Sequence, residues 1–306
     1  MARGKRKGRP INGWLVIDKD AGVTSTWVVG AVKRLTDAQK AGHGGTLDPL
    51  ATGILPIALG EATKTVPYVM DSSKAYRFTL RFGEARDTDD AEGQVTATSD
   101  LRPDDAAIEA ALPAFIGTIM QRPPDFAAVK IQGERAYDLA RRGEAVEIEP
   151  REVRIDQLRL VERPDADHAV LDMGCGKGAY VRAVARDLGR RLGCLAHVTQ
   201  LRRTRVGPFG LDRAVRLETL ERIVEDDSLP QALVPVVTAL AGIPALAVTE
   251  PQAIRLKAGQ AVVVAPQLVE GEVTEAAAIK VLSAGELVAL ARLDGAELTP
   301  LRIFNS

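Results

Sequence analysis

Alternating apolar residues predict strands along most of the chain, and apolar residues at helical spacing predict the helices between them. Strands are expected over residues 13–22, 74–85, 152–162, 168–178 and 197–210. Helices are expected over 24–36, with Thr24 or Ser25 as the N-cap, and over 103–117, 179–193 and 214–226. Within 74–85, every second residue is apolar or aromatic, as in a strand with one buried face: Tyr76, Phe78, Leu80 and Phe82.

Two segments depart from this pattern. Residues 121–150 have few apolar anchors and several turn residues, which predicts an excursion from the core with a short helix around 136–142. After Pro244 only short alternating apolar runs follow, which predicts a small β domain at the end of the chain.

Composition describes an ordinary globular protein. The chain has 306 residues, of which 46% are hydrophobic and 26% are charged, enough for one large and one small domain. No apolar run is long enough to span a membrane, and the basic N-terminus lacks the apolar segment of a secretory signal. The two cysteines, Cys175 and Cys194, indicate no disulfide framework, so the default expectation is a cytoplasmic protein.

Charge is segregated along the chain, although the net charge is only −1. Residues 1–10 hold five basic residues and no acid, and are expected to form a disordered tail. Residues 173–216 hold ten basic residues against two acidic ones, a difference of +8. Such a cluster can present a positive face to phosphates. The alternative is a solvated face with salt bridges, which fits residues 186–191 better than the LRRTR run at 201–205.

One carboxylate lies in an unusual setting within residues 42–64, GHGGTLDPLATGILPIALGEATK. Asp48 follows three closely spaced glycines and precedes Pro49, and both residue types favour a tight, stiff turn. A carboxylate on such a loop suits an active site. The alternative is that Asp48 caps a helix starting near Pro49, and the local pattern leaves both interpretations open.

The strand–loop sequence VLDMGCGKG, residues 170–178, matches the cofactor loop of many methyltransferases. Two observations argue against that function. No acidic residue occurs in GCLAHVTQLRRTR, about where the second strand of a nucleotide-binding fold carries one. The β-only pattern of 244–306 also lacks the further strand–helix units that the fold needs. The histidines and cysteines lack zinc-site spacing.

Five segments resemble one family in order and spacing: GWLVIDKDAGVTS, the 42–64 block, SKAYRFTLRFGEARDTDDAEG, QRPPDFAAVKIQGERAY and GKGAYVRAVARDLGRRLGCLAHVTQLRRTRVGPF. The chain is similar to the bacterial tRNA pseudouridine-55 synthases, the TruB family, over about residues 11–215. The C-terminal part resembles more weakly a small PUA-like RNA-binding domain.

The resemblance implies an α+β fold: a mixed, largely antiparallel sheet with flanking helices, plus a small C-terminal β domain. The expected domains are a basic tail at 1–10, a catalytic domain at 11–240 and a PUA-like domain at 244–306. The excursion at 121–150 would close over an RNA stem-loop, with Arg135 and Arg141 facing phosphates.

The activity implied is isomerisation of one T-loop uridine of tRNA, U55, to pseudouridine. The partner would be the T-arm stem-loop of tRNA. The resemblance implies no cofactor, no metal, no membrane and a monomeric chain. A catalytically idle RNA-binding protein on the same scaffold is the second hypothesis, and retention of Asp48, Tyr76 and Arg182 argues against it.

By resemblance, Asp48 is the nucleophile, and either C6 of the uracil or C1′ of the ribose is its target. Arg182 is implied as the charge partner of Asp48, and a solvated helix arginine is the alternative. Asp90 is expected to join this network. Tyr76 is implied to pack against the target base, and a core strand tyrosine is the alternative.

Four further residues are carried over as substrate contacts: Tyr180, Leu201, His43 and Lys64. His43 would stack in the refolded T-loop, and Lys64 would contact RNA backbone unless it is an ordinary surface lysine. The chain departs from the family where Gly44 replaces the frequent Thr, Asp20 the usual Pro and Ala127 the usual Ser. Gly44 is expected to loosen the loop that holds Asp48.

Overall fold

The computed structural model describes residues 8–127, 130–131, 134–135, 142, 148–271 and 278–305. Most of the basic tail and, apart from residue 142, the helix expected around 136–142 lie outside the described residues. Arg141 and the side chain of Arg135 lie outside them as well.

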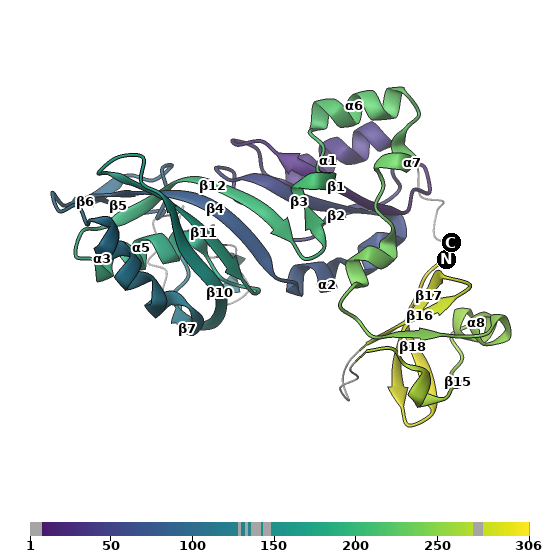
Figure 1. Cartoon of the computed structure of the whole chain (residues 1–306). Coiled ribbons are helices and arrows are strands. Elements are labelled where there is room, and N and C mark those ends of the chain that lie inside the picture. The colour runs from purple at the N-terminus through teal and green to yellow at the C-terminus, as the bar shows by residue number, and fades with distance from the viewer. Residues whose placement is uncertain are drawn as a thin grey trace.

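A nine-stranded sheet forms the body of the molecule (Figure 1). Its strands are β1 (Gly13–Lys19), β2 (Ala41–His43), β3 (Thr52–Leu59), β4 (Lys74–Phe82), β7 (Gly117–Gln121), β10 (Arg151–Glu162), β11 (His168–Cys175), β12 (Ala196–Val206) and β13 (Phe209–Gly210). Their order is β1-β3-β12-β4-β11-β10-β7, with β2 beside β3 and β13 beside β12. The named pairs are antiparallel except β3 with β12, which run parallel. The expected largely antiparallel sheet is confirmed.

Helices flank this sheet: α1 (Ser25–Thr36), α2 (Val66–Asp71), α3 (Asp105–Ala111), α5 (Val181–Arg191), α6 (Leu217–Glu225) and α7 (Leu229–Ala232). Short 3-10 turns are η1 (Gly60–Lys64), η2 (Leu112–Phe115), η3 (Leu211–Arg213) and η4 (Val236–Leu240). Two small hairpins complete the body, β5 (Glu84–Arg86) with β6 (Val95–Thr98) and β8 (Lys130–Ile131) with β9 (Glu134–Arg135). Thr24 caps α1, because its side chain accepts a hydrogen bond from the N–H of Trp27 at 3.1 Å.

The predicted alternation on β4 sets the inside of the body. Phe78, Leu80 and Phe82 are buried, whereas Arg77, which precedes Phe78, is exposed. The buried row belongs to one large core with the apolar side of α5, which includes Val184. The core therefore lies on the α5 side of the sheet, and the other side of β4 carries polar residues.

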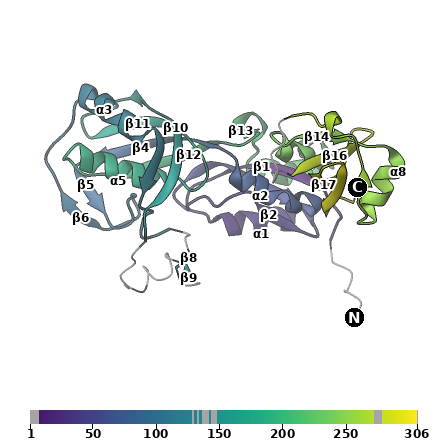
Figure 2. The same cartoon turned by 90° about the horizontal axis from the view of Figure 1, so that it is seen from below.

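A second sheet is formed near the end of the chain by β14 (Ala245–Ala247), β15 (Val262–Val263), β16 (Ile279–Ser283), β17 (Glu286–Asp294) and β18 (Glu297–Ile303). It has a buried cluster of its own and lies to one side of the body (Figures 1 and 2). The expectation of β structure alone is wrong here, because α8 (Glu250–Lys257) covers the sheet, followed by η5 (Pro266–Leu268). Thr249 and Gln252 form a capping box at the start of α8. The sequence contains this helix signal, but the alternating apolar residues around it favoured a prediction of strands.

Two further expectations are corrected. No helix begins at Pro49, because the small apolar run after it forms the buried strand β3. The interpretation of Asp48 as a helix cap is therefore wrong. The methyltransferase loop is also a false match. Although 170–178 does lead from β11 towards α5, β11 pairs antiparallel with both β4 and β10, whereas a doubly wound nucleotide fold needs parallel neighbours.

Among the described residues, no helix is both long and apolar enough to cross a membrane.

Candidate active site

A cavity of about 250 Å³ opens beside the start of α5. Two loops form most of its wall, residues 45–48 after β2 and residues 176–182 after β11. Met70, Lys74, Tyr76, Leu201 and Arg203 complete it. The cavity brings together five residues that the sequence singled out, from elements far apart in the chain: Asp48, Tyr76, Tyr180, Arg182 and Leu201.

The loop over residues 44–51, called the Asp48 loop below, is fixed on both sides of Asp48. The buried hydroxyl of Ser25 accepts from the N–H of Leu47 at 2.9 Å and donates to its carbonyl at 3.0 Å. The carbonyl of Pro49 accepts from the N–H of Gly22 at 2.8 Å and from Lys19 Nζ at 3.1 Å. Because the neighbouring backbone is held this way, the Asp48 carboxylate is presented by a preorganised turn.

Arg203 supports the same loop from beneath. It is 2% exposed and donates to the carbonyl of Thr46 at 3.0 Å, of Gly45 at 3.1 Å and of Ile54 at 2.8 Å. Its planar guanidinium thus joins the Asp48 loop to β3. Sequence reasoning missed this role, although Arg203 lies two residues after Leu201 on β12 and therefore points to the same, inner face.

Arg182 holds Asp48. Its Nη2 lies 2.9 Å from Asp48 Oδ2, and its Nη1 lies 3.4 Å from Asp90 Oδ2. It also donates to the carbonyls of Thr88 at 2.9 Å and Phe126 at 3.1 Å. Arg182 is only 4% exposed, so the solvated-helix alternative is wrong. Asp90 lies beside Arg182 at salt-bridge distance.

The two carboxylates beside Arg182 differ in exposure. The Asp48 side chain is 36% exposed, against 5% for Asp90. Asp90 is also bound by Thr88 Oγ1 at 2.6 Å and by the N–H of Glu92 at 3.1 Å. Asp90 is therefore built into the protein, whereas Asp48 is the carboxylate that faces an incoming molecule.

Two tyrosines and a leucine give the cavity apolar surface. Burial raises the pKa of Tyr76 and of Tyr180, so both phenols are neutral at physiological pH. Tyr76 continues the inward row of β4, packs against the core and also lines the cavity. The buried amide of Gln121 fixes the backbone of Tyr180, accepting from its N–H at 2.8 Å and donating to its carbonyl at 3.2 Å.

His43 and Lys64 do not line this cavity. His43 Nδ1 accepts from the N–H of Gly45 at 3.3 Å, and burial followed by the nearby Arg203 lowers its pKa, so the ring is neutral with its proton on Nε2. Lys64 Nζ lies 2.6 Å from Glu61 and donates to the carbonyl of Ile303 at 2.7 Å. Its charge is thus already paired within the chain, next to the second sheet.

Two buried lysines near the site were missed by the sequence reasoning: Lys74 lines the cavity, and Lys19 contacts the Asp48 loop. Burial lowers the pKa of Lys19 to about 8, although the charge of Asp48 opposes this change. Burial, with Arg203 next, lowers the pKa of Lys74 to about 8 as well. Lys74 Nζ donates to the carbonyls of Met70 and Ser72, which closes the end of α2 onto β4.

The basic cluster of residues 173–216 is divided, so neither interpretation made from charge alone describes all of it. Arg182, Arg186 and Arg203 are buried, whereas the exposed members are Lys177, Arg190, Arg191, Arg205, Arg213 and Arg216. Arg186 is 6% exposed and pairs with Asp89 at 3.0 Å and Asp187 at 2.8 Å. Arg202 pairs with Asp18 at 2.7 Å. Asp187 is the sequence neighbour of Arg186, but Asp89 and Asp18 come from distant segments, and the sequence gives no signal for that distant pairing.

The three departures from the family pattern lie in different settings. A Cβ at Gly44 would stand 2.6 Å from Val69 Cγ1 and 3.3 Å from Trp14 Cζ3, so glycine here permits close packing, which argues against the expected loosening. Asp20 is exposed and Ala127 is buried. Among the described residues, no group of three or more histidine, cysteine, aspartate or glutamate side chains could hold a metal ion.

Two family models match consecutive parts of the chain. One described as "TruB family pseudouridylate synthase (N terminal domain)" matches residues 33–181. One described as "tRNA pseudouridylate synthase B C-terminal domain" matches residues 182–241. The boundary between the two falls at the start of α5, so both matches contribute to the cavity, and both end before the second sheet.

Curated relatives extend the match over the whole chain. The tRNA pseudouridine synthase B of Caulobacter vibrioides is 54% identical, covering 100% of this chain and 99% of its own length. That of Bradyrhizobium diazoefficiens is 55% identical, covering 98% and 88%.

Among solved structures, a chain of the archaeal box H/ACA sRNP Nop10–Cbf5 complex superimposes with a TM-score of 0.76 at 23% identity, over 96% of this chain and 86% of its own. A chain of an H/ACA RNP bound to a substrate RNA containing 2′-deoxyuridine gives 0.76 at 22% identity, over 100% and 92%. These likenesses bear on the fold alone.

The family models and the curated relatives identify the protein with this sheet, and with Asp48 held by Arg182 at its cavity, as a pseudouridine synthase, which is an isomerase. The chain belongs to the TruB family of pseudouridylate synthases.

Proposed function

We propose that this chain isomerises the T-loop uridine of tRNA, U55, to pseudouridine, with Asp48 as the nucleophile. The observation that carries the proposal is the pair of Asp48 and Arg182 at 2.9 Å in the wall of a cavity that also contains Tyr76 and Tyr180. The curated relatives named tRNA pseudouridine synthase B support tRNA as the substrate.

The reaction requires an ionised carboxylate. Asp48 adds to C6 of the uracil or attacks C1′ of the ribose, and on either route the bond between N1 and C1′ breaks. The base turns over, C5 bonds to C1′, and the bond between Asp48 and the substrate carbon breaks, which regenerates the carboxylate. The proton on C5 leaves while N1 is protonated. Arg182 pairs with Asp48 at 2.9 Å and so fixes the position of its carboxylate at the cavity wall.

The target base has to leave the T-loop stack to reach Asp48. In this proposal Tyr76 packs against the flipped base, and Tyr180 and Leu201 contact the nucleotide from the opposite wall of the cavity. Their neutral, partly apolar surfaces stack with a base without competing for the carboxylate.

Other assignments rest on the resemblance. His43 stacks in the refolded T-loop, and Lys64 contacts RNA backbone, for which its pair with Glu61 would have to rearrange. Residues 121–150 close over the stem-loop, 11–240 form the catalytic unit, and 244–306 form a PUA-like RNA-binding unit. The chain acts as a cytoplasmic monomer without metal or cofactor.

The test is incubation of the enzyme with an unmodified tRNA transcript, followed by mapping of pseudouridine. The proposal predicts one modified position, the T-loop U55, without added cofactor. A transcript with cytidine at that position is the matched control and should gain no pseudouridine. Modification at a uridine outside the T-loop would contradict the specificity, and no modification at all would favour the idle RNA-binding alternative.

A further inference from the structure

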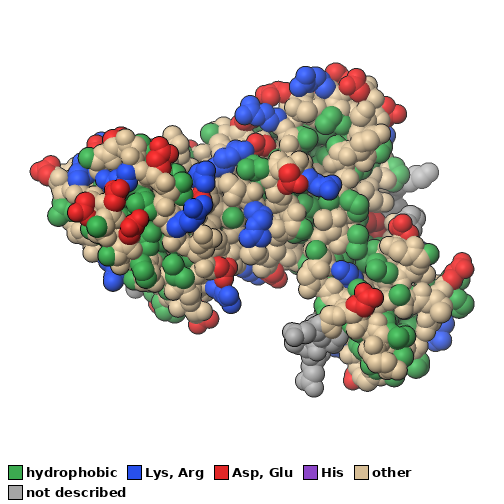
Figure 3. Space-filling model, viewed as in Figure 1, with side chains coloured by type: hydrophobic (Ala, Val, Ile, Leu, Met, Phe, Trp, Pro, Cys, Tyr) green, Lys and Arg blue, Asp and Glu red, His purple; other side chains and the backbone are tan. Residues whose placement is uncertain are grey.

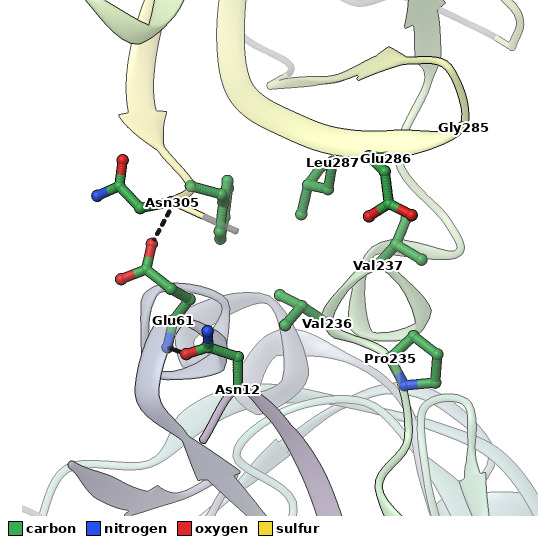
Figure 4. A pocket seen from close by; sticks show the side chains of 10 residues that line it. Asn12, Glu61, Pro235, Val236, Val237, Gly285, Glu286, Leu287 and Asn305 are labelled. Atoms are coloured by element: carbon green, nitrogen blue, oxygen red, sulfur yellow. Dashed lines mark hydrogen bonds between the residues drawn. The ribbon is translucent and has the colours of Figure 1, made fainter. Parts of the chain in front are cut away.

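The end of the chain is fastened to η1, beside a cavity of about 480 Å³ (Figure 4). Glu61 Oε2 accepts from the N–H of Asn305 at 2.8 Å and from Lys64 Nζ at 2.6 Å. Lys64 Nζ also donates to the carbonyl of Ile303 at 2.7 Å. The N–H of Glu61 is itself held by Asn12 Oδ1 at 2.9 Å. Directed polar contacts therefore join the second sheet to the turn that follows β3.

Phe304 extends this junction into an apolar cluster. Phe304 is 4% exposed and packs in one cluster with Leu240 of η4 and Leu290 of β17, both 0% exposed. Tyr68 of α2 packs against the same cluster. Buried apolar side chains are densely packed and transmit displacement, so a shift of the second sheet would displace α2.

Three consecutive residues of α2 face three different parts of the molecule. Tyr68 meets the Phe304 cluster, and Met70 lines the cavity. Val69, between them, is 0% exposed and lies against Gly44, whose Cβ would be 2.6 Å from Val69 Cγ1. The short helix α2 thus connects the second sheet to the first residue of the Asp48 loop and to the cavity wall.

The charge of the second sheet favours a role through packing. Residues 244–306 contain seven acidic and five basic residues, a net charge of −2. On the face shown in Figure 3, lysine and arginine side chains gather over the middle of the body, and the second sheet shows both signs. Long-range electrostatic attraction of a polyanion is therefore not the main contribution of the second sheet.

We propose that the second sheet braces the Asp48 loop through α2, and that Phe304, Tyr68 and Val69 are positioning residues for the reaction. The kinetic part of this inference rests on the proposed function. A brace of this kind acts on turnover more than on binding, because it sets where the carboxylate stands relative to the bound base.

The contact between α2 and the loop is tested by exchanging size. Gly44→Ala places a methyl group against Val69 and should lower kcat on a T-arm stem-loop RNA about tenfold with KM little changed. The double variant Gly44→Ala/Val69→Ala makes room for that methyl group and should regain most of the loss. Gly42→Ala is the matched control, since a Cβ there meets no atom within 4 Å. A double variant no better than the single one overturns the proposal.

The contact between α2 and the second sheet is tested by hydrogen exchange on the full chain without RNA. Phe304→Ala should speed amide exchange in residues 44–51 as well as in the second sheet. Val262→Ala is the control, because Val262 lies in the separate core of the second sheet, and it should speed exchange there alone. Faster exchange confined to the second sheet in Phe304→Ala overturns the brace. Hydrogen exchange needs no turnover, so this test of the brace remains valid even if the wild-type enzyme forms no pseudouridine in the T-arm RNA. That failure would refute only the proposed function.

Discussion

A few charged residues surround the carboxylate of Asp48. Arg182 contacts it at 2.9 Å, and Lys19 lies close enough for the Asp48 charge to raise the pKa of that lysine against the effect of burial. Asp90 shares Arg182 and lies on its other side. Of the two carboxylates beside Arg182, Asp48 lines the cavity and Asp90 does not.

Arg203 is the residue on which the shape of the Asp48 loop most depends. Replacing it by lysine keeps the charge but removes the planar fork that reaches Gly45, Thr46 and Ile54. Carbonyls left without donors should lower the free energy of unfolding by about 3 kcal/mol, and kcat should fall as well. Denaturant unfolding and single-turnover kinetics measure both. Wild-type stability in Arg203→Lys would show that the fork is dispensable.

The buried lysines predict a pH dependence of stability. The pKa of Lys74 is about 8 in the folded protein against an ordinary value of 10.5, so between these two values the unfolded chain binds more protons than the folded one. The free energy of unfolding contributed by Lys74 therefore rises as pH increases from 8 to 10.5. Relative to Lys74→Met, the wild type should gain stability over this window in urea titrations. Parallel curves for the two proteins would contradict the lowered pKa.

At the scale of elements, the path of β3 past β12 depends on one glycine. Gly53 has φ +97°, and a Cβ there would lie 2.2 Å from the carbonyl oxygen of Arg203. Gly53→Ala should cost at least about 3 kcal/mol of unfolding free energy, since it combines a left-handed backbone with a backbone clash. Gly42→Ala, in open space, should change it by less than about 0.5 kcal/mol. Equal stability of the two variants would refute this account of β3.

Elements with a strong local pattern could be predicted from the sequence. The alternation of Phe78, Leu80 and Phe82 located β4, and the cap at Thr24 located α1. The strand β3 was missed because its small apolar residues lie among buried neighbours on both faces and so show no alternation. Its parallel partner β12 lies about 150 residues away, with Arg203 opposite Gly53, and no local signal specifies such pairing.

Candidate site residues divide in the same way. Asp48 was singled out by its glycine-rich loop, and Tyr76 and Arg182 through the family resemblance. Their convergence in one cavity could not have been deduced from spacing. Arg203, Lys19 and Ser25 escaped notice because their roles consist of hydrogen bonds to backbone carbonyls and amides. The type of a residue does not show whether it makes such contacts.

At the scale of the whole molecule, binding of RNA should depend on salt less than the raw charge of residues 173–216 suggests, since Arg182, Arg186 and Arg203 are buried. Lys177 is an exposed member of that cluster, with 65% of its side chain accessible, and it lines the cavity. Lys177→Gln should reduce the slope of log Kd against log salt concentration by about 1. Arg292→Gln, on the exposed side of β17, should leave the slope unchanged. If the wild type, Lys177→Gln and Arg292→Gln all showed the same slope of log Kd against log salt concentration, the RNA phosphates would not contact Lys177.

The most direct test of the whole account is the single-turnover rate of pseudouridine formation in Asp48→Asn, measured on an unmodified tRNA transcript. The substitution keeps the shape of the side chain and removes the nucleophilic charge, so the rate should fall by at least about 10⁴-fold while tRNA still binds. Asp20→Asn, the same change at an exposed carboxylate of a neighbouring loop, should keep the wild-type rate within a small factor. An Asp48→Asn enzyme that forms pseudouridine at a rate near that of the wild type would contradict the central claim.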